Sequence, residues 1–161
     1  MERKPLRLPD YDYGQAGVYF LTLCARDKAP LFGRVCVGGG VLDAPKVELS
    51  PCGTAVRAQL EEMAQVYKHV SLSRYVIMPN HVHILLQVHG SSGTPTPTRA
   101  NQVVPSFVSA FKRMVARRCG GLVWQRGYYD HVIRNDADFL RIWNYIDTNP
   151  AKWAEDEYFV R

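Results

Sequence analysis

Two apolar runs, residues 73–78 and 81–88, flank the dipeptide Pro79-Asn80 near the middle of the chain. Proline suits a tight turn or a strand edge better than a strand interior. Both runs have strand length, so we predict two strands joined by a tight bend. Because alternate side chains of a strand point to the same face, His81 and His83 must point the same way.

The remaining elements follow from hydrophobic periodicity and from turn residues. We predict strands at residues 17–24, 32–37, 41–49 and 128–134, the first of them central in its sheet and the second and third a hairpin around Gly38-Gly39-Gly40. We predict helices from Ser50-Pro51 to about His69, from about Pro105 to Gly120-Gly121, and from near Asn135 to before Pro150.

These elements are interspersed without strict alternation of strand and helix. We therefore expect an α+β fold in which a largely antiparallel β-sheet carries helices packed on one face. A chain of 161 residues suits one ordinary domain with its own core, so a single domain over residues 1–161 is expected. Residues 90–102 have no periodicity and many turn formers, which predicts a flexible loop.

The composition fits a soluble chain, with 47% hydrophobic and 22% charged residues. No apolar run has the length of a membrane span and no secretion signal opens the chain, so we expect a cytoplasmic protein without a membrane partner. Four cysteines without a Cys-x-x-Cys pair indicate reduced thiols. The net charge of +5 favours a polyanionic partner.

The pair His81 and His83 can bind one metal ion from one face of a strand. Two histidines on the solvated face of an edge strand are the simpler explanation of a bare His-x-His motif. The surrounding residues Val82, Ile84 and Leu85 are apolar, however, so the strand is expected to be buried. Buried imidazoles need a partner, and a metal ion is one such partner.

The third predicted helix offers a second group of candidate residues. Tyr145 and Asn149 lie one turn apart on a flank of its apolar stripe, so their side chains can reach the same site. Taken singly, Tyr145 is an aromatic residue at the edge of the core and Asn149 a residue at the helix end. Taken together, a phenol that attacks a phosphodiester and an amide oxygen that completes a metal site fit one chemistry.

Two separated motifs resemble those of one family. Residues 78–83, Met-Pro-Asn-His-Val-His, resemble the His-hydrophobic-His signature of the HUH endonucleases, and specifically of their single-tyrosine transposases. Residues 145–150, Tyr-Ile-Asp-Thr-Asn-Pro, resemble the nucleophile helix of the same family. Residues 7–13, 19–23 and 124–134 also look like the branch of REP-associated tyrosine transposases, so the resemblance spans nearly the whole chain.

The resemblance implies a ferredoxin-like fold and a transposase that cuts and rejoins single-stranded DNA. It assigns Tyr145 as the nucleophile, which forms a 5′-phosphotyrosine and releases a 3′-hydroxyl. It assigns His81, His83 and Asn149 as ligands of Mg²⁺ or Mn²⁺. The partner would be single-stranded or hairpin DNA, and both monomers and homodimers occur among such proteins. His131 and Asp147 lie near the motifs without an assigned role.

DNA contacts are expected from basic side chains of the second helix and of the segment after it. The candidates for phosphate contacts are Lys112, Arg113, Arg117, Arg118, Arg126 and Arg134. Tyr128 and Tyr129 are aromatic residues that can stack on unpaired bases or else belong to the core.

Three alternatives differ in class from this hypothesis. A nucleotide hydrolase of the histidine-triad type needs a further histidine two positions after His83, where the chain has Leu85. A domesticated DNA-binding protein would recognise repeat hairpins without transposition. A structural protein would hold zinc through His81 and His83, and removal of the metal would unfold it.

Overall fold

The computed structural model describes residues 17–38, 44–89 and 103–160. The strands are β1 (Gly17–Cys24), β2 (Gly33–Cys36), β3 (Lys46–Leu49), β4 (Val70–Ile77), β5 (His81–Val88) and β6 (Tyr129–Val132). The helices are α1 (Pro51–Val66), α2 (Val103–Cys119), α3 (Asp136–Thr148) and the 3₁₀ segments η1 (Arg26–Lys28) and η3 (Pro150–Glu155).

Four strands form an antiparallel sheet in the order β4-β5-β1-β6. The succession β1, α1, β4, β5, α2, β6 with this strand order is the ferredoxin-like arrangement. The α+β class and the interior position of β1 are therefore confirmed. β2 and β3 pair with each other in a separate two-stranded sheet, which confirms the predicted hairpin.

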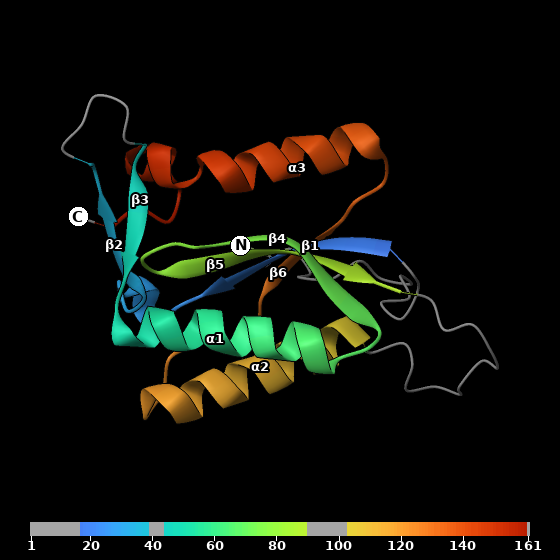
Figure 1. Cartoon of the computed structure of the whole chain (residues 1–161). Coiled ribbons are helices and arrows are strands. Elements are labelled where there is room, and N and C mark those ends of the chain that lie inside the picture. The colour runs from blue at the N-terminus through green and yellow to red at the C-terminus, as the bar shows by residue number, and fades with distance from the viewer. Residues whose placement is uncertain (1–16, 39–43, 90–102, 161) are drawn as a thin grey trace, which may run out of the picture.

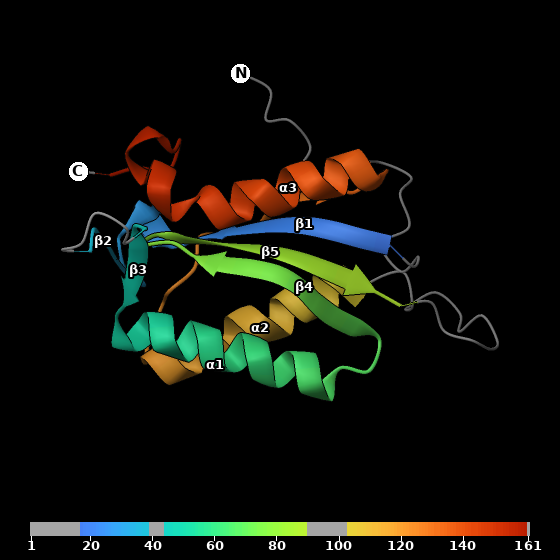
Figure 2. The same cartoon turned by 45° about the horizontal axis from the view of Figure 1, so that its top comes forward.

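The helices lie on both faces of the four-stranded sheet. Figures 1 and 2 show α1 and α2 side by side on one face and α3 on the other. The expectation that helices pack on one face thus holds for α1 and α2 but not for α3. Because β1 and β5 are apolar on both faces, the sheet can be covered from both sides.

Alternation along the strands divides the buried side chains between the two faces. Leu21 and Leu23 belong to the core under α1 and α2, whereas Phe20 packs with Ile142 and Ile146 of α3. By the same alternation along β5, His83 lies on the face of Phe20, against which its ring stacks at 5.1 Å. The two histidines therefore face α3.

The turn and the caps follow the local sequence. The Met78 backbone N–H donates to the His81 carbonyl at 2.8 Å, which closes the predicted bend at Pro79-Asn80. Ser50 caps α1 by accepting from the Gly53 N–H. Asn135 likewise caps α3 by accepting from the Asp138 N–H. α1 ends three residues before the predicted His69.

Some sequence predictions fall on residues that the structure does not describe. These are the flexible loop at residues 90–102, the similarity of residues 7–13 to transposases, and the start of the strand at residues 41–49. The single-domain organisation stays a prediction.

The cysteines differ from the prediction of four reduced thiols. Cys52 of α1 and Cys119 at the end of α2 form a disulfide, whereas Cys24 and Cys36 are free. The prediction was wrong for this pair because the partners are 67 residues apart in sequence and meet only through the packing of the two helices. Within residues 17–38, 44–89 and 103–160, no helix is long and apolar enough to span a membrane.

Candidate functional site

His81 and His83 lie on the interior strand β5, where both side chains are buried. A solvated edge strand is excluded because β5 pairs with β4 on one side and β1 on the other. Thr22 of β1 is directly opposite His83, and its hydroxyl lies 2.8 Å from Nδ1. The two imidazole rings are close neighbours, with centroids 4.5 Å apart.

The Asn80 side chain fixes which nitrogen of His81 carries the proton. Its amide nitrogen donates to the carbonyls of Lys28 at 3.2 Å and Tyr158 at 2.7 Å. Its amide oxygen therefore faces His81 Nδ1, at 2.8 Å. That oxygen can only accept, so Nδ1 of His81 is the donor, and in the neutral ring the lone pair is on Nε2.

Three buried ligand-type atoms lack a hydrogen-bond partner among the described residues: Nε2 of His81, Nε2 of His83 and Oδ1 of Asn149. Burial lowers the pKa of His81 to about 3. Burial, followed by the neighbouring His81, lowers the pKa of His83 well below its ordinary value. Neutral imidazoles offer lone pairs, so the donor set fits a bound cation.

Asp156 is a further ligand-type residue that the sequence predictions missed. Ligand atoms of His81, His83 and Asp156 all lie within 4.8 Å of one another. The Asp156 carboxylate is 3.9 Å from His81 Nε2, and burial raises its pKa. No spacing signal connects it with the histidines, because η3 and the residue after it fold back to β5 only in the tertiary structure.

Tyr145 and Asn149 lie on the flank of α3 that faces β5. The Tyr145 ring contacts the rings of His83, with centroids 5.2 Å apart, and Phe20, at 6.0 Å. Its side chain is 38% exposed, whereas Asn149 is buried. Burial raises the pKa of the Tyr145 phenol, and the nearby Asn149 side chain opposes this shift. The structure thus brings the four predicted site residues together.

The six predicted DNA contacts are divided between two parts of the molecule. Lys112, Arg113, Arg117 and Arg118 lie on α2, across the sheet from the histidines. The Lys112 ammonium donates to the carbonyls of Gln125 and Gly127, and burial lowers its pKa to about 8. Arg118 pairs with Glu62 at 2.6 Å.

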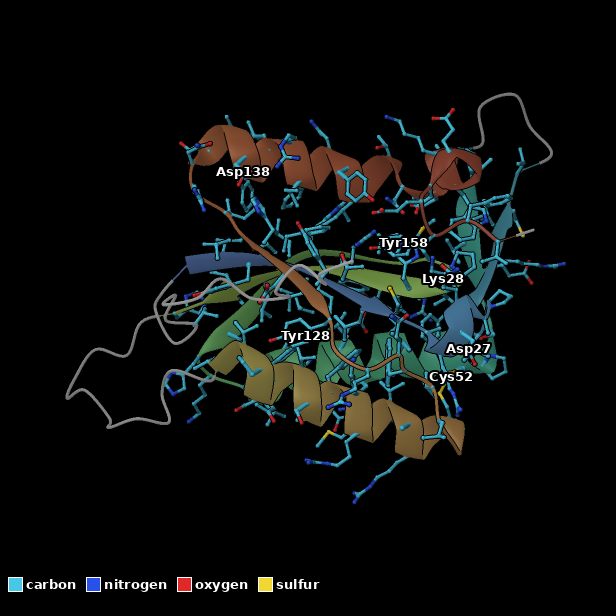
Figure 3. All side chains as sticks on the ribbon, turned by 180° about the vertical axis from the view of Figure 1, so that it is seen from behind. Asp27, Lys28, Cys52, Tyr128, Asp138 and Tyr158 are labelled. Atoms are coloured by element: carbon cyan, nitrogen blue, oxygen red, sulfur yellow. A yellow bond between two sulfur atoms is a disulfide. The ribbon has the colours of Figure 1, made fainter. Side chains whose placement is uncertain are left out.

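Arg126 and Arg134 are exposed and lie before and after β6. Neither makes an ion pair with another residue in the described part of the chain. Arg126 lines a surface cavity of about 780 Å³ together with Arg26, Lys28 and Trp124. Figure 3 labels Lys28 at this end of the sheet, near Tyr158.

Two residues without an assigned role have definite partners. His131 Nε2 lies 2.8 Å from the Asp138 carboxylate, and Asp147 pairs with Arg74 at 2.6 Å. Of the two adjacent tyrosines, Tyr128 belongs to the core, whereas Tyr129 is exposed.

The chain is similar to proteins of known sequence and of known structure. No family model matches the chain. An uncharacterized protein of Haemophilus influenzae is 34% identical over 175 aligned positions, which cover 98% of this chain and 93% of that protein. A second Haemophilus influenzae protein, named as a REP-associated tyrosine transposase, is 22% identical over 147 positions, or 88% of this chain and 74% of its own length.

The fold is shared with a solved structure of a REP-associated tyrosine transposase bound to a REP hairpin. The TM-score is 0.63 at 19% sequence identity, and the match covers 94% of this chain and 74% of the other. Identity at this level speaks for the fold alone.

Proposed function

We propose that the chain is a REP-associated tyrosine transposase, in keeping with its similarity to the Haemophilus influenzae protein of that name, and that it cuts and rejoins single-stranded DNA with Tyr145 as the nucleophile. The observation that carries this proposal is the set of buried ligand atoms of His81, His83 and Asn149 beside the Tyr145 ring, which have no hydrogen-bond partner in the part of the chain that the structure describes. Hairpin DNA is the proposed substrate, in keeping with the hairpin bound by the structural relative.

The proposed chemistry exchanges one phosphodiester bond for another. The phenolic oxygen of Tyr145 loses its proton and attacks the phosphorus, the bond from phosphorus to the 3′ oxygen breaks, and the departing 3′ oxygen takes up a proton. The 5′ end remains on Tyr145 as a phosphotyrosine, and the departing strand ends in a 3′-hydroxyl. A 3′-hydroxyl that attacks the phosphotyrosine reverses the step, so rejoining needs no ATP.

Mg²⁺ or Mn²⁺ is the proposed cofactor, with His81, His83 and Asn149 as ligands and the Asp156 carboxylate as a fourth. Amide and carboxylate oxygens suit hard cations, and imidazoles suit transition metals, so this mixed set favours Mn²⁺. A cation bound there would stabilise negative charge that develops on the attacked phosphate. The chain itself contributes the positions: β5 holds the imidazoles, and α3 holds the phenol beside them.

The direct test is covalent trapping. Purified protein is incubated with labelled hairpin oligonucleotides and Mn²⁺, and a protein–DNA adduct that survives denaturation is sought by electrophoresis. The proposal expects an adduct with wild-type protein. Hairpin binding without an adduct on any oligonucleotide would instead favour a domesticated DNA-binding protein.

Asn80 should control metal affinity through His81. We expect Asn80→Leu to weaken Mn²⁺ binding by about 10–100-fold, because nothing then holds the proton on Nδ1. Asn80→Asp retains an acceptor for His81 and should weaken binding much less. Both variants lose the two bonds to backbone carbonyls, so both should melt at lower temperature. Isothermal titration calorimetry with Mn²⁺ measures the metal affinity separately from the change in stability. Equal loss of affinity in both variants would contradict the role of Asn80 in orienting His81.

Arg126 and Arg134 are the strongest candidates among the proposed phosphate contacts. Both are exposed and make no ion pair among the described residues, and unlike Arg113 and Arg117 they do not lie on α2, across the sheet from the histidines. Replacement of either by glutamine should reduce the slope of log affinity against log salt by about one unit. Arg118→Gln is the matched control, since Glu62 already neutralises Arg118. Fluorescence anisotropy across a salt series measures the slopes. An equal change in the control would argue against this ranking.

A further inference from the structure

A cavity of about 610 Å³ opens beside Tyr145 on the α3 side of the sheet. Its volume lies in the range of ligand pockets, roughly 300–1,000 Å³. The side chains that line it come from β1, β5, β6, α3 and the C-terminal residues. They are Phe20, Thr22, His83, Tyr129, His131, Arg141, Ile142, Tyr145, Glu157 and Tyr158. Of the proposed metal ligands and nucleophile, His83 and Tyr145 are among these lining residues.

The strand register explains why β6 contributes to this cavity. Tyr129 is directly opposite Thr22 and His131 is directly opposite Phe20. Directly opposed residues of antiparallel strands share a face of the sheet. Tyr129 and His131 therefore lie on the same face as His83, two strands away, with β1 between them. Tyr129 is 50% exposed, so its ring is available to a ligand.

Asp138 holds two polar groups at the rim of the cavity. Its carboxylate is 2.8 Å from His131 Nε2 and 2.5 Å from the Arg141 guanidinium. A carboxylate accepts, so Nε2 of His131 is the donor, and in the neutral ring Nδ1 is an acceptor. Figure 3 shows Asp138 at the start of α3, on the same side of the sheet as Tyr158. One donor and one acceptor are thus fixed in place.

The charge balance argues against a phosphate at this rim. Asp138 neutralises Arg141, and Glu157 adds a further negative charge. An aromatic wall with fixed donors and acceptors but no net positive charge suits a nucleobase, which stacks and forms hydrogen bonds along its edge.

We propose that this cavity binds one unpaired nucleobase next to the phosphodiester that Tyr145 attacks, with Tyr129 stacking on the base and His131 and Arg141 contacting its edge. The inference rests on the proposed function and adds to it a site of sequence recognition. Such a site would select which phosphodiester of an unpaired strand reaches the nucleophile.

The test begins with a labelled hairpin oligonucleotide that forms the adduct with wild-type protein, because the adduct identifies the cleaved bond. Each unpaired nucleotide is then replaced by an abasic residue, and affinity is measured by fluorescence anisotropy with the full chain carrying Tyr145→Phe. One abasic position beside the cleaved bond should weaken binding at least about fivefold, the lower end of what stacking of one base contributes.

The decisive comparison repeats this scan with Tyr129→Ala added. The penalty at that one position should largely disappear, whereas Val66→Ala, at an exposed side chain of α1 on the opposite face, should leave it unchanged. An undiminished penalty with Tyr129→Ala would overturn the proposal. A second result would also overturn it. If a methylphosphonate at that position weakens binding and Arg141→Ala removes this effect, the cavity holds a phosphate and not a base.

Failure of the nucleobase-site proposal can be distinguished from failure of the proposed function. If wild-type protein forms an adduct and the scan shows no coupling to Tyr129, only the base site is wrong. If no hairpin gives an adduct, the proposed function is wrong and the base site falls with it. Melting curves of the Tyr129→Ala protein exclude a loss of fold, which is not expected at a half-exposed side chain.

Discussion

Replacement of Tyr145 by phenylalanine is expected to abolish the covalent protein–DNA adduct, with a loss on the order of 10⁴-fold or more in the rate of its formation. The phenolic oxygen is the proposed attacking atom. The ring keeps its contacts with His83 and Phe20, because only the hydroxyl is removed. The measurement is denaturing electrophoresis of the adduct over time with Mn²⁺.

Binding measurements separate this chemical role from a structural one. Mn²⁺ affinity and hairpin affinity of Tyr145→Phe should stay close to those of the wild type. Tyr75→Phe is the matched control, because Tyr75 packs on the opposite face and donates to Glu61. An adduct that persists in Tyr145→Phe would show that the nucleophile is another residue.

Removal of the divalent metal is expected to stop adduct formation without unfolding the protein. Two hydrophobic clusters, one on each face of the sheet, stabilise the fold without a bound metal. A cation at 100 times its dissociation constant adds only about 2.7 kcal/mol. For a chain of this size that corresponds to a Tm change of no more than about 10 °C. Calorimetric melting with and without chelator measures the shift, and added Mn²⁺ or Mg²⁺ should restore the adduct.

The same experiment tests the structural-zinc alternative, which expects the chain to unfold when metal is removed. A loss of the cooperative melting transition in chelator would favour that alternative. Within the site, Asp156→Asn should weaken Mn²⁺ binding, whereas Asp147→Asn should not, since Asp147 instead pairs with Arg74. Equal affinity in both variants would remove Asp156 from the set of ligands.

Local patterns were sufficient for most elements of the fold. The bend at Pro79-Asn80, the helix starts at Ser50-Pro51 and near Asn135, and the apolar strand at Gly17–Cys24 depend on neighbours in sequence, and the structure confirms each of them. The position of α3 across the sheet from α1 and α2 was missed. Periodicity shows that a helix has an apolar stripe but not which face of the sheet that stripe covers.

In the candidate site, too, some features follow from the local sequence and others only from the tertiary structure. His81 and His83 share a face because alternation along one strand requires it, and Tyr145 and Asn149 share a flank because one helical turn separates them. Sequence alone thus determined each pair and the chemistry its residues can supply. Only the tertiary structure decided that β5 and α3 bring the pairs together, that Asn80 directs the His81 lone pair inward, and that Asp156 and His131 lie nearby. These contacts join residues far apart in the chain, and their geometry depends on how the whole sheet and its covering helices pack.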